Sequence, residues 1–145
     1  EDPVPKLLAH LRKDMGAEGT VVVWNKGFEM GRNREMGEMF PEYKVFLENL
    51  NARVFDLMEI FRDQHFVHPE FHGSYSIKKV LPVLVPGTSH QDLEIHDGGM
   101  ASLGWYRMIF GNLPEAEQKQ TAKNLLEYCK LDTLAMVMIY KNLLA

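Results

Sequence analysis

Two acidic motifs, far apart in the chain, are the parts of this sequence that could carry chemistry. Glu29 closely follows an apolar run at residues 20–24, and much later Tyr128 and Asp132 stand four positions apart. Residues at i and i+4 share one face of a helix, so this phenol and carboxylate would lie side by side. Carboxylates on rigid elements are the ligands that Mg²⁺ or Mn²⁺ takes. We therefore predict Glu29 and Asp132 as metal ligands.

Tyr128 is the candidate that would act on water. In two-metal phosphodiester cleavage, ions about 3.5–4 Å apart stabilise the attacking water and the leaving oxygen. A tyrosine one turn before a helical aspartate can orient that water, and Glu29 follows a strand at the point where open α/β sheets place their sites. The pattern predicts a metal-dependent nuclease site with Tyr128, Glu29 and Asp132 as catalytic residues.

The elements that position these residues predict a helix-rich α/β chain. Residues 20–24 are β-branched and aromatic without polar alternation, which indicates a strand buried in a parallel or mixed sheet, and no other strand is predicted. Residues 65–73 show neither period and predict a loop. Pro82 is expected to break or end the helix in which it stands. A first helix is predicted near the N-terminus, where Leu7, Leu8, Leu11 and Met15 repeat at helical spacing. Further helices are predicted over residues 28–40, 41–61, 77–81, 98–110, 115–128 and 131–144.

Composition and charge narrow the possible classes. The 145 residues, 46% hydrophobic and 25% charged, are typical of a single domain over residues 1–145. Sixteen basic against 20 acidic residues give a formal charge of -4, so no overall positive field draws nucleic acid. The single cysteine, Cys129, excludes an intrachain disulfide and suits the cytoplasm. No apolar stretch reaches the roughly 20 residues of a membrane span, so no membrane partner is expected.

The motifs around the acids resemble a known nuclease superfamily. Asn-Lys-Gly-Phe-Glu at residues 25–29 resembles the second motif, Asn-x-x-Phe-Asp, of the DEDD or DnaQ-like 3′–5′ exonucleases. Tyr128-x-x-x-Asp132 resembles the third motif of their tyrosine subclass. Residues 73–82 and 128–137 resemble an uncharacterised bacterial family with an RNase H-like fold, over nearly the whole chain. This resemblance implies an RNase H-like fold with a reduced sheet, Mg²⁺ or Mn²⁺ as cofactor, and a single-stranded DNA or RNA end as partner.

Two features depart from the exonuclease pattern. Glu29 stands where these exonucleases carry aspartate, and its longer carboxylate can still bind a metal. Their first motif, Asp-x-Glu on a first strand, has no counterpart in residues 1–24, whereas Asp92-Leu93-Glu94 has the letters but lies in a polar loop after the second motif. The sequence starts at Glu1 without methionine, so we expect the missing strands and carboxylates upstream of it. On this hypothesis the chain alone is nearly inactive.

Several other residues have a structural interpretation beside a functional one. Asn25 is predicted to hold the strand-to-helix turn, with substrate contact as the alternative. Asp56 is predicted to be structural, while His68 and Lys78 are candidates for substrate contact because their segments match the family. The histidines outside the first helix fit no compact zinc template and are expected in loop packing or at the surface: His65, His68, His72, His90 and His96.

Alternatives to a nuclease stay open at this point. An exonuclease fold that has lost metal binding would serve as a binding or scaffolding module in a larger nucleic-acid-processing protein. An unrelated helical interaction domain is a third hypothesis, favoured if Glu29 and Asp132 lie far apart. An unpaired edge at residues 21–23 would also allow self-association.

Overall fold

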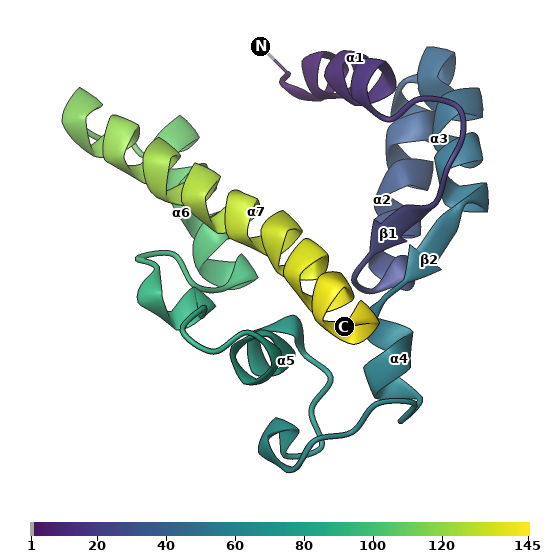
Figure 1. The fold of residues 1–145 in the computed structure, drawn as a ribbon. Coiled ribbons are helices and arrows are strands. Elements are labelled where there is room, and N and C mark those ends of the chain that lie inside the picture. Colours follow the sequence, from purple (N-terminus) through teal and green to yellow (C-terminus); the bar gives the residue numbers. More distant parts are fainter. Residues whose placement is uncertain (1) are drawn as a thin grey trace. The chain divides into compact units, whose positions relative to one another are not determined.

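The computed structural model describes residues 2–145, which divide into two compact units, one ending at Phe66 and the other covering Val67–Ala145 (Figure 1). The first unit contains α1 (Val4–Asp14), β1 (Val21–Val23), α2 (Lys26–Met39), the 3₁₀ helix η1 (Pro41–Tyr43), α3 (Lys44–Ala52), β2 (Val54–Asp56) and α4 (Met58–Arg62). The second contains η2 (Pro69–Phe71), α5 (Ile77–Leu84), η3 (His90–Asp92), α6 (Gly98–Phe110) and α7 (Glu115–Leu144). A single domain over the whole chain stays a prediction.

A parallel strand pair is the centre of the first unit. In β1 and β2, Val21 pairs with Val54, Val22 with Phe55 and Val23 with Asp56. Parallel neighbours require a crossover, which α2, η1 and α3 provide between the two strands. Helix-rich α/β structure and a strand at residues 21–23 are thereby confirmed, although only Val23 of that strand is buried and its two neighbours are half-buried.

The prediction of one helix over residues 41–61 is wrong, because β2 interrupts it. Arg53 ends α3, and its guanidinium reaches back across the chain to the loop before β1. There it donates to the carbonyl oxygens of Glu18 at 2.6 Å, Gly19 at 2.7 Å and Gly16 at 3.2 Å. These bonds hold the chain beside β1, where the β-branched Val54 and aromatic Phe55 suit a strand.

The core of the first unit forms where α1 meets α3. Leu8, Leu47 and Leu50 are buried together, and each such side chain contributes roughly 1.5–3 kcal/mol on burial. Gly37 lets α2 approach α3 closely, since a Cβ atom there would lie 3.4 Å from Lys44 Cα. The apolar face predicted for the N-terminal helix therefore packs in this core, where Leu8 of α1 is buried with Leu47 and Leu50 of α3.

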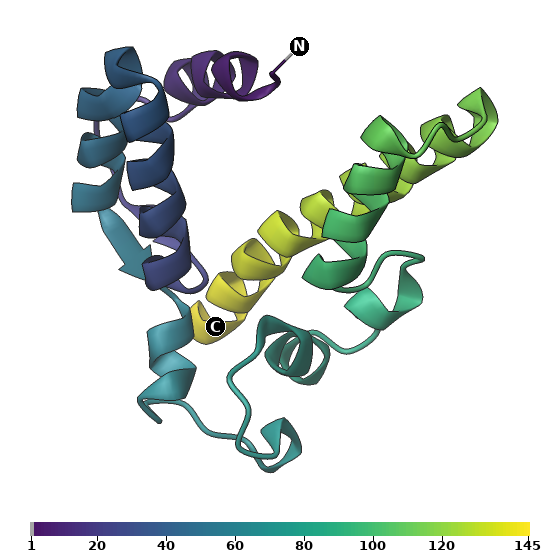
Figure 2. The same cartoon turned by 180° about the vertical axis from the view of Figure 1, so that it is seen from behind.

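In the second unit α6 runs beside the first part of α7, and α5 packs on α7 as well (Figures 1 and 2). Residues 115–128 and 131–144 form one continuous helix, with Tyr128, Ala135 and Ile139 as its buried residues. Pro82 does not end α5 at once, since the helix continues to Leu84. Asn142 Nδ2 donates to the Leu84 carbonyl oxygen at 2.8 Å and so ties α7 to the end of α5.

Candidate functional site

Side chains from α5, η3 and α7 meet in the second unit. The Nε2 atom of His90 lies 2.8 Å from Asp132 Oδ1, and the His90 ring meets the Tyr128 ring edge-on at 6.0 Å between centroids. Lys78 Nζ lies 6.0 Å from the centroid of the same Tyr128 ring. Three of the residues that the sequence nominated, Lys78, Tyr128 and Asp132, are thus brought together. The cluster also contains His90, for which the sequence predicted only loop packing or surface exposure.

The turn before η3 places His90 in this cluster. Gly87 adopts a positive φ of 83°, which glycine takes without a steric penalty, and the chain then enters η3. Ser89 Oγ accepts the backbone N–H of Gln91 at 3.1 Å and so caps η3. The imidazole that follows points toward α7. In the sequence, Ser89 before His90 is a local signal for the cap of η3, but it does not show that His90 pairs with Asp132.

Burial differs sharply between His90 and Asp132. The side chain of His90 is 0% exposed, whereas that of Asp132 is 38% exposed. An ionised carboxylate only accepts hydrogen bonds, so Nε2 of His90 is the donor in this pair. Among the described residues, Nδ1 is a buried atom with no hydrogen-bond partner. Because this nitrogen is enclosed, Asp132 is the member of the pair that solvent or a ligand can reach.

Tyr128 is a neutral donor in this setting. Burial raises its pKa to about 12, and the negative charge of Asp132 and a hydrogen bond with it act in the same direction. The phenol lies beside the start of α6, since a Cβ atom at Gly98 would be 3.9 Å from its oxygen. Asp97 caps that helix by accepting the Met100 N–H at 2.8 Å, a bond that is the main cause of its lowered pKa. Tyr128 therefore keeps its proton at neutral pH.

The other acidic candidate stands at the carboxyl end of β1 in the first unit. Asn25 follows the strand in the left-handed region, with φ 75°, and its Oδ1 accepts the Phe28 N–H at 3.3 Å. Glu29 is half-buried in the first turn of α2, where the helix dipole favours a negative charge. Asn25 thus holds the strand-to-helix turn, as predicted, and its contact with substrate stays a prediction.

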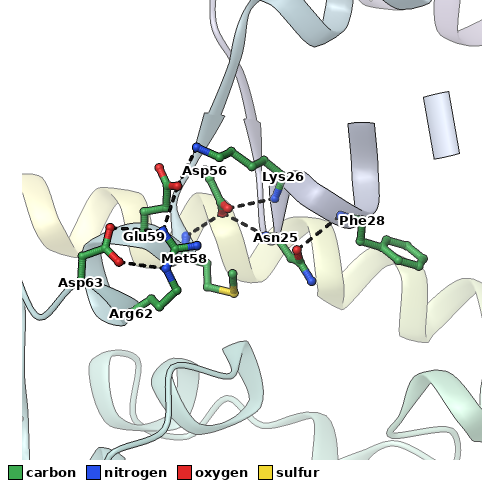
Figure 3. A network of polar contacts seen from close by, with 8 residues as sticks. All are labelled: Asn25, Lys26, Phe28, Asp56, Met58, Glu59, Arg62 and Asp63. Atoms are coloured by element: carbon green, nitrogen blue, oxygen red, sulfur yellow. Dashed lines mark hydrogen bonds and ion pairs between the residues drawn. The ribbon is translucent and has the colours of Figure 1, made fainter. Parts of the chain in front are cut away.

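Asp56 fixes this turn from the adjacent strand, as Figure 3 shows. Its Oδ1 accepts the Asn25 N–H at 2.9 Å and the Met58 N–H at 3.1 Å, and its Oδ2 accepts the Lys26 N–H at 2.9 Å. The residue is 2% exposed. These contacts confirm the predicted structural role, because a buried carboxylate that receives several backbone donors holds the chain in place.

Exposed ion pairs surround the same turn (Figure 3). Lys26 Nζ lies 2.6 Å from Glu59 Oε1, and Arg62 bridges Glu59 and Asp63 at 3.0 and 2.8 Å. Hydrogen bonds from Lys26 and then Arg62 lower the pKa of Glu59. Lys26 and Arg62 are therefore paired with Glu59 and Asp63, and these ion pairs stabilise the turn.

His68 has a local role in the structure. Its Nδ1 accepts the Glu70 N–H at 3.2 Å and caps η2, while its ring lies 5.6 Å from that of Phe71. Contact of the exposed His68 with substrate stays a prediction. It is not one of the side chains that meet around Tyr128.

Glu29 and Asp132 were predicted as ligands of Mg²⁺ or Mn²⁺. Glu29 and Asp132 offer the oxygen donors that hard cations take, although they belong to different units. Within residues 2–145, no group of three or more histidine, cysteine, aspartate or glutamate residues could hold a metal ion. A complete site would need further oxygen ligands.

No helix within residues 2–145 combines the length and apolarity needed to cross a membrane.

Comparisons with known proteins identify relatives of this chain. Residues 1–76 match the model of a family described as a domain of unknown function, DUF2779. An uncharacterized protein of Ureaplasma parvum is 29% identical over 140 residues, which cover 86% of the chain and 20% of that protein. Uncharacterized proteins of Mycoplasma pneumoniae and Mycoplasma genitalium are 32% and 29% identical over 81% and 92% of the chain, and 19% and 22% of their own lengths. The chain spans about a fifth of these relatives, and no solved structure matches it.

Proposed function

This chain belongs to the DUF2779 family, and from that premise we propose that it contributes to a metal-dependent, 3′–5′ exonuclease-like site that acts on single-stranded DNA or RNA ends. The observation that carries the proposal is the meeting of Lys78, Tyr128 and Asp132 in the second unit. The motifs had nominated these residues separately, from segments about 50 positions apart in the sequence.

Each residue has a role that its surroundings support. Asp132 in the second unit and Glu29 in the first would each bind Mg²⁺ or Mn²⁺. The bound ions would supply stabilisation of the attacking and leaving oxygens. Tyr128, neutral at physiological pH, shares its one O–H with Asp132, and its phenol oxygen would accept a hydrogen bond from the attacking water. Lys78 places a positive charge beside the phenol, where a phosphodiester would lie.

The fold is consistent with this assignment. A parallel strand pair with Glu29 at the carboxyl end of β1 supports an RNase H-like fold of the DEDD type, because open α/β sheets place their sites at that edge. The proposal includes a cytoplasmic location, where the exposed thiol of Cys129 would stay reduced. It also requires carboxylates beyond Glu29 and Asp132, so we expect low activity from the 145 residues alone.

The test is the shortening of a 5′-labelled single-stranded oligonucleotide by the chain in the presence of Mn²⁺. We expect slow loss of nucleotides from the 3′ end, lowered about tenfold or more by Asp132→Asn and by Tyr128→Phe. Glu127→Gln is the matched control, since Glu127 is an exposed acid on the same helix, 3.9 Å from Lys123.

Two outcomes would contradict the proposal. Rapid hydrolysis that Asp132→Asn leaves unchanged would place the chemistry elsewhere. Binding of the oligonucleotide with no shortening above the Asp132→Asn level would instead favour a non-catalytic binding or scaffolding module.

A further inference from the structure

Helix α6 is rich in apolar residues but buries none of them. Large side chains are exposed along its length: Met100, Leu103, Trp105, Tyr106, Ile109 and Phe110. An extended exposed apolar surface of this kind marks an interaction site. We propose that the aromatic end of α6, formed by Trp105, Tyr106 and Phe110, is a platform on which the bases of a single-stranded nucleic acid stack.

The three rings contact one another and remain open to solvent. The Trp105 and Phe110 rings are nearly perpendicular, at 78°, with 6.1 Å between centroids, and the Tyr106 ring lies 5.1 Å from that of Phe110. Trp105 is nevertheless 43% exposed, Tyr106 59% and Phe110 60%. Gly104 marks the packed side of the helix, since a Cβ atom there would lie 3.6 Å from Thr121 Cγ2 of α7. Ring surface is therefore available to a flat ligand.

The charges around these rings favour a polyanion over an apolar protein surface. Arg107 is exposed on the same helix, and residues 98–114 contain no aspartate or glutamate. The next acid along the sequence, Glu115, is paired with Lys119 at 2.6 Å. The outer surface of α6 is therefore positive, although the chain as a whole carries a formal charge of -4. An arginine among aromatic rings suits a single strand, because guanidinium groups contact phosphates while bases stack on the rings.

The start of α6 connects this platform to the cluster around Tyr128. A Cβ atom at Gly98 would lie 3.9 Å from the phenol oxygen of Tyr128. At 1.5 Å of rise per residue, residues 105–110 lie roughly 10–18 Å farther along the helix, which a single strand spans with a few nucleotides. A strand whose end lies at Tyr128 would therefore bring its bases onto α6. The inference rests on the proposed function only in its choice of single-stranded nucleic acid as partner, and it requires no metal ion.

The test measures the binding of labelled oligothymidylate to the 145-residue chain by fluorescence anisotropy in the presence of EDTA. An abasic oligonucleotide of the same length is the matched ligand, because it keeps the phosphates and lacks the bases. Oligouridylate is measured in a parallel arm, so that DNA and RNA are compared directly. We expect the wild type to bind the two oligonucleotides that carry bases more tightly than the abasic one by about fivefold or more.

Substitutions at Tyr106 separate base stacking from simple apolar contact. Tyr106→Phe keeps an aromatic ring, whereas Tyr106→Leu keeps apolar bulk and helix propensity without a ring. We expect Tyr106→Leu to weaken oligothymidylate binding about fivefold or more, and Tyr106→Phe to stay within about twofold of the wild type. Tyr140→Leu is the control, since Tyr140 is 45% exposed near the end of α7, and it should bind like the wild type. Circular dichroism confirms that each variant is folded.

The fluorescence of Trp105 reports stacking directly. A base that stacks on an indole quenches its emission, so oligothymidylate should quench the wild type and the abasic oligonucleotide should not. Trp105→Phe keeps a ring and should bind within about twofold of the wild type, but the quenching should disappear. The remaining tryptophan, Trp24, belongs to the first unit. Quenching that persists in Trp105→Phe would place the stacked base away from α6 and overturn the inference.

The remaining outcomes separate this inference from the proposed function. If the wild type binds oligothymidylate and Tyr106→Leu binds it equally well, the platform is wrong and the nucleic-acid partner stands. If Tyr106→Leu weakens binding but the wild type shortens no oligonucleotide with Mn²⁺, the platform stands and the exonuclease proposal fails. If no oligonucleotide binds, both are wrong. A dimer in sedimentation that Tyr106→Leu dissociates, with equal affinity for abasic and base-carrying strands, would show that a second copy of the chain covers α6.

Discussion

Asp56 in the first unit and Asp132 in the second are both held by hydrogen bonds, but the donors differ in kind. Asp56 is 2% exposed and accepts backbone N–H groups from Asn25, Lys26 and Met58. Asp132 has a side chain that is 38% exposed and interacts with the side chains of His90 and Tyr128. Backbone donors make a carboxylate hold the chain, whereas side-chain donors hold the carboxylate itself and leave one side of it accessible.

Both residues are aspartates, but their hydrogen-bond donors predict different roles. Asp56 is predicted to stabilise the fold, and Asp132 is proposed to bind a ligand. Removing Asp56 would leave part-buried backbone N–H groups without their charged acceptor at the point where β1 turns into α2. Removing the charge of Asp132 would leave the fold with an acceptor still available to His90, because the asparagine Oδ1 replaces the carboxylate oxygen. Substitution of Asp56 should therefore lower the free energy of unfolding, whereas substitution of Asp132 should weaken Mn²⁺ binding.

The largest expected effect is the loss of stability in Asp56→Ala. Three backbone N–H groups lose a charged acceptor, which should lower the free energy of unfolding by about 3–5 kcal/mol. Urea denaturation followed by circular dichroism measures it. The control is Asp63→Ala, which removes an exposed ion pair with Arg62 and should hardly move the midpoint. A loss below about 1 kcal/mol in Asp56→Ala would show that the turn does not depend on this carboxylate.

A smaller effect is expected from the ionisation of Tyr128. Its pKa is raised to about 12 in the folded chain, against about 10 when unfolded, so the folded state binds the phenolic proton more tightly. The resulting stability is fully present below pH 10 and is lost as the pH rises from about 10 to 12. The tyrosinate absorbance of the wild type minus that of Tyr128→Phe should show a midpoint near pH 12. A midpoint near pH 10 would mean that neither burial nor Asp132 acts on this phenol.

Local patterns in the sequence predicted the parts of both sites that depend on neighbouring residues. The strand at residues 21–23, the helix that carries Glu29 and the shared face of Tyr128 and Asp132 all follow from short-range spacing. The structural role of Asp56 was also predicted. The evidence for the strand, the helix and the shared face lies within a few positions of the residues, whereas Asp56 binds Asn25 and Lys26, 31 and 30 positions earlier.

The features that sequence reasoning missed depend on partners far along the chain. β2 forms where Arg53 binds carbonyl oxygens more than 30 positions earlier, and His90 acquires its role from Asp132, 42 positions later. Neither pairing leaves a periodic trace in the sequence. The existence of metal ligands beyond Glu29 and Asp132 stays a prediction.

The most direct test of this account measures the free energy of unfolding and the Mn²⁺ dissociation constant for Asp56→Asn and Asp132→Asn, each against the wild type. We predict that Asp56→Asn loses stability, while Asp132→Asn changes stability by less than about 1 kcal/mol and weakens Mn²⁺ binding about tenfold or more. If Asp132→Asn destabilises the chain as much as Asp56→Asn and binds Mn²⁺ like the wild type, Asp132 is a structural residue and the account is wrong.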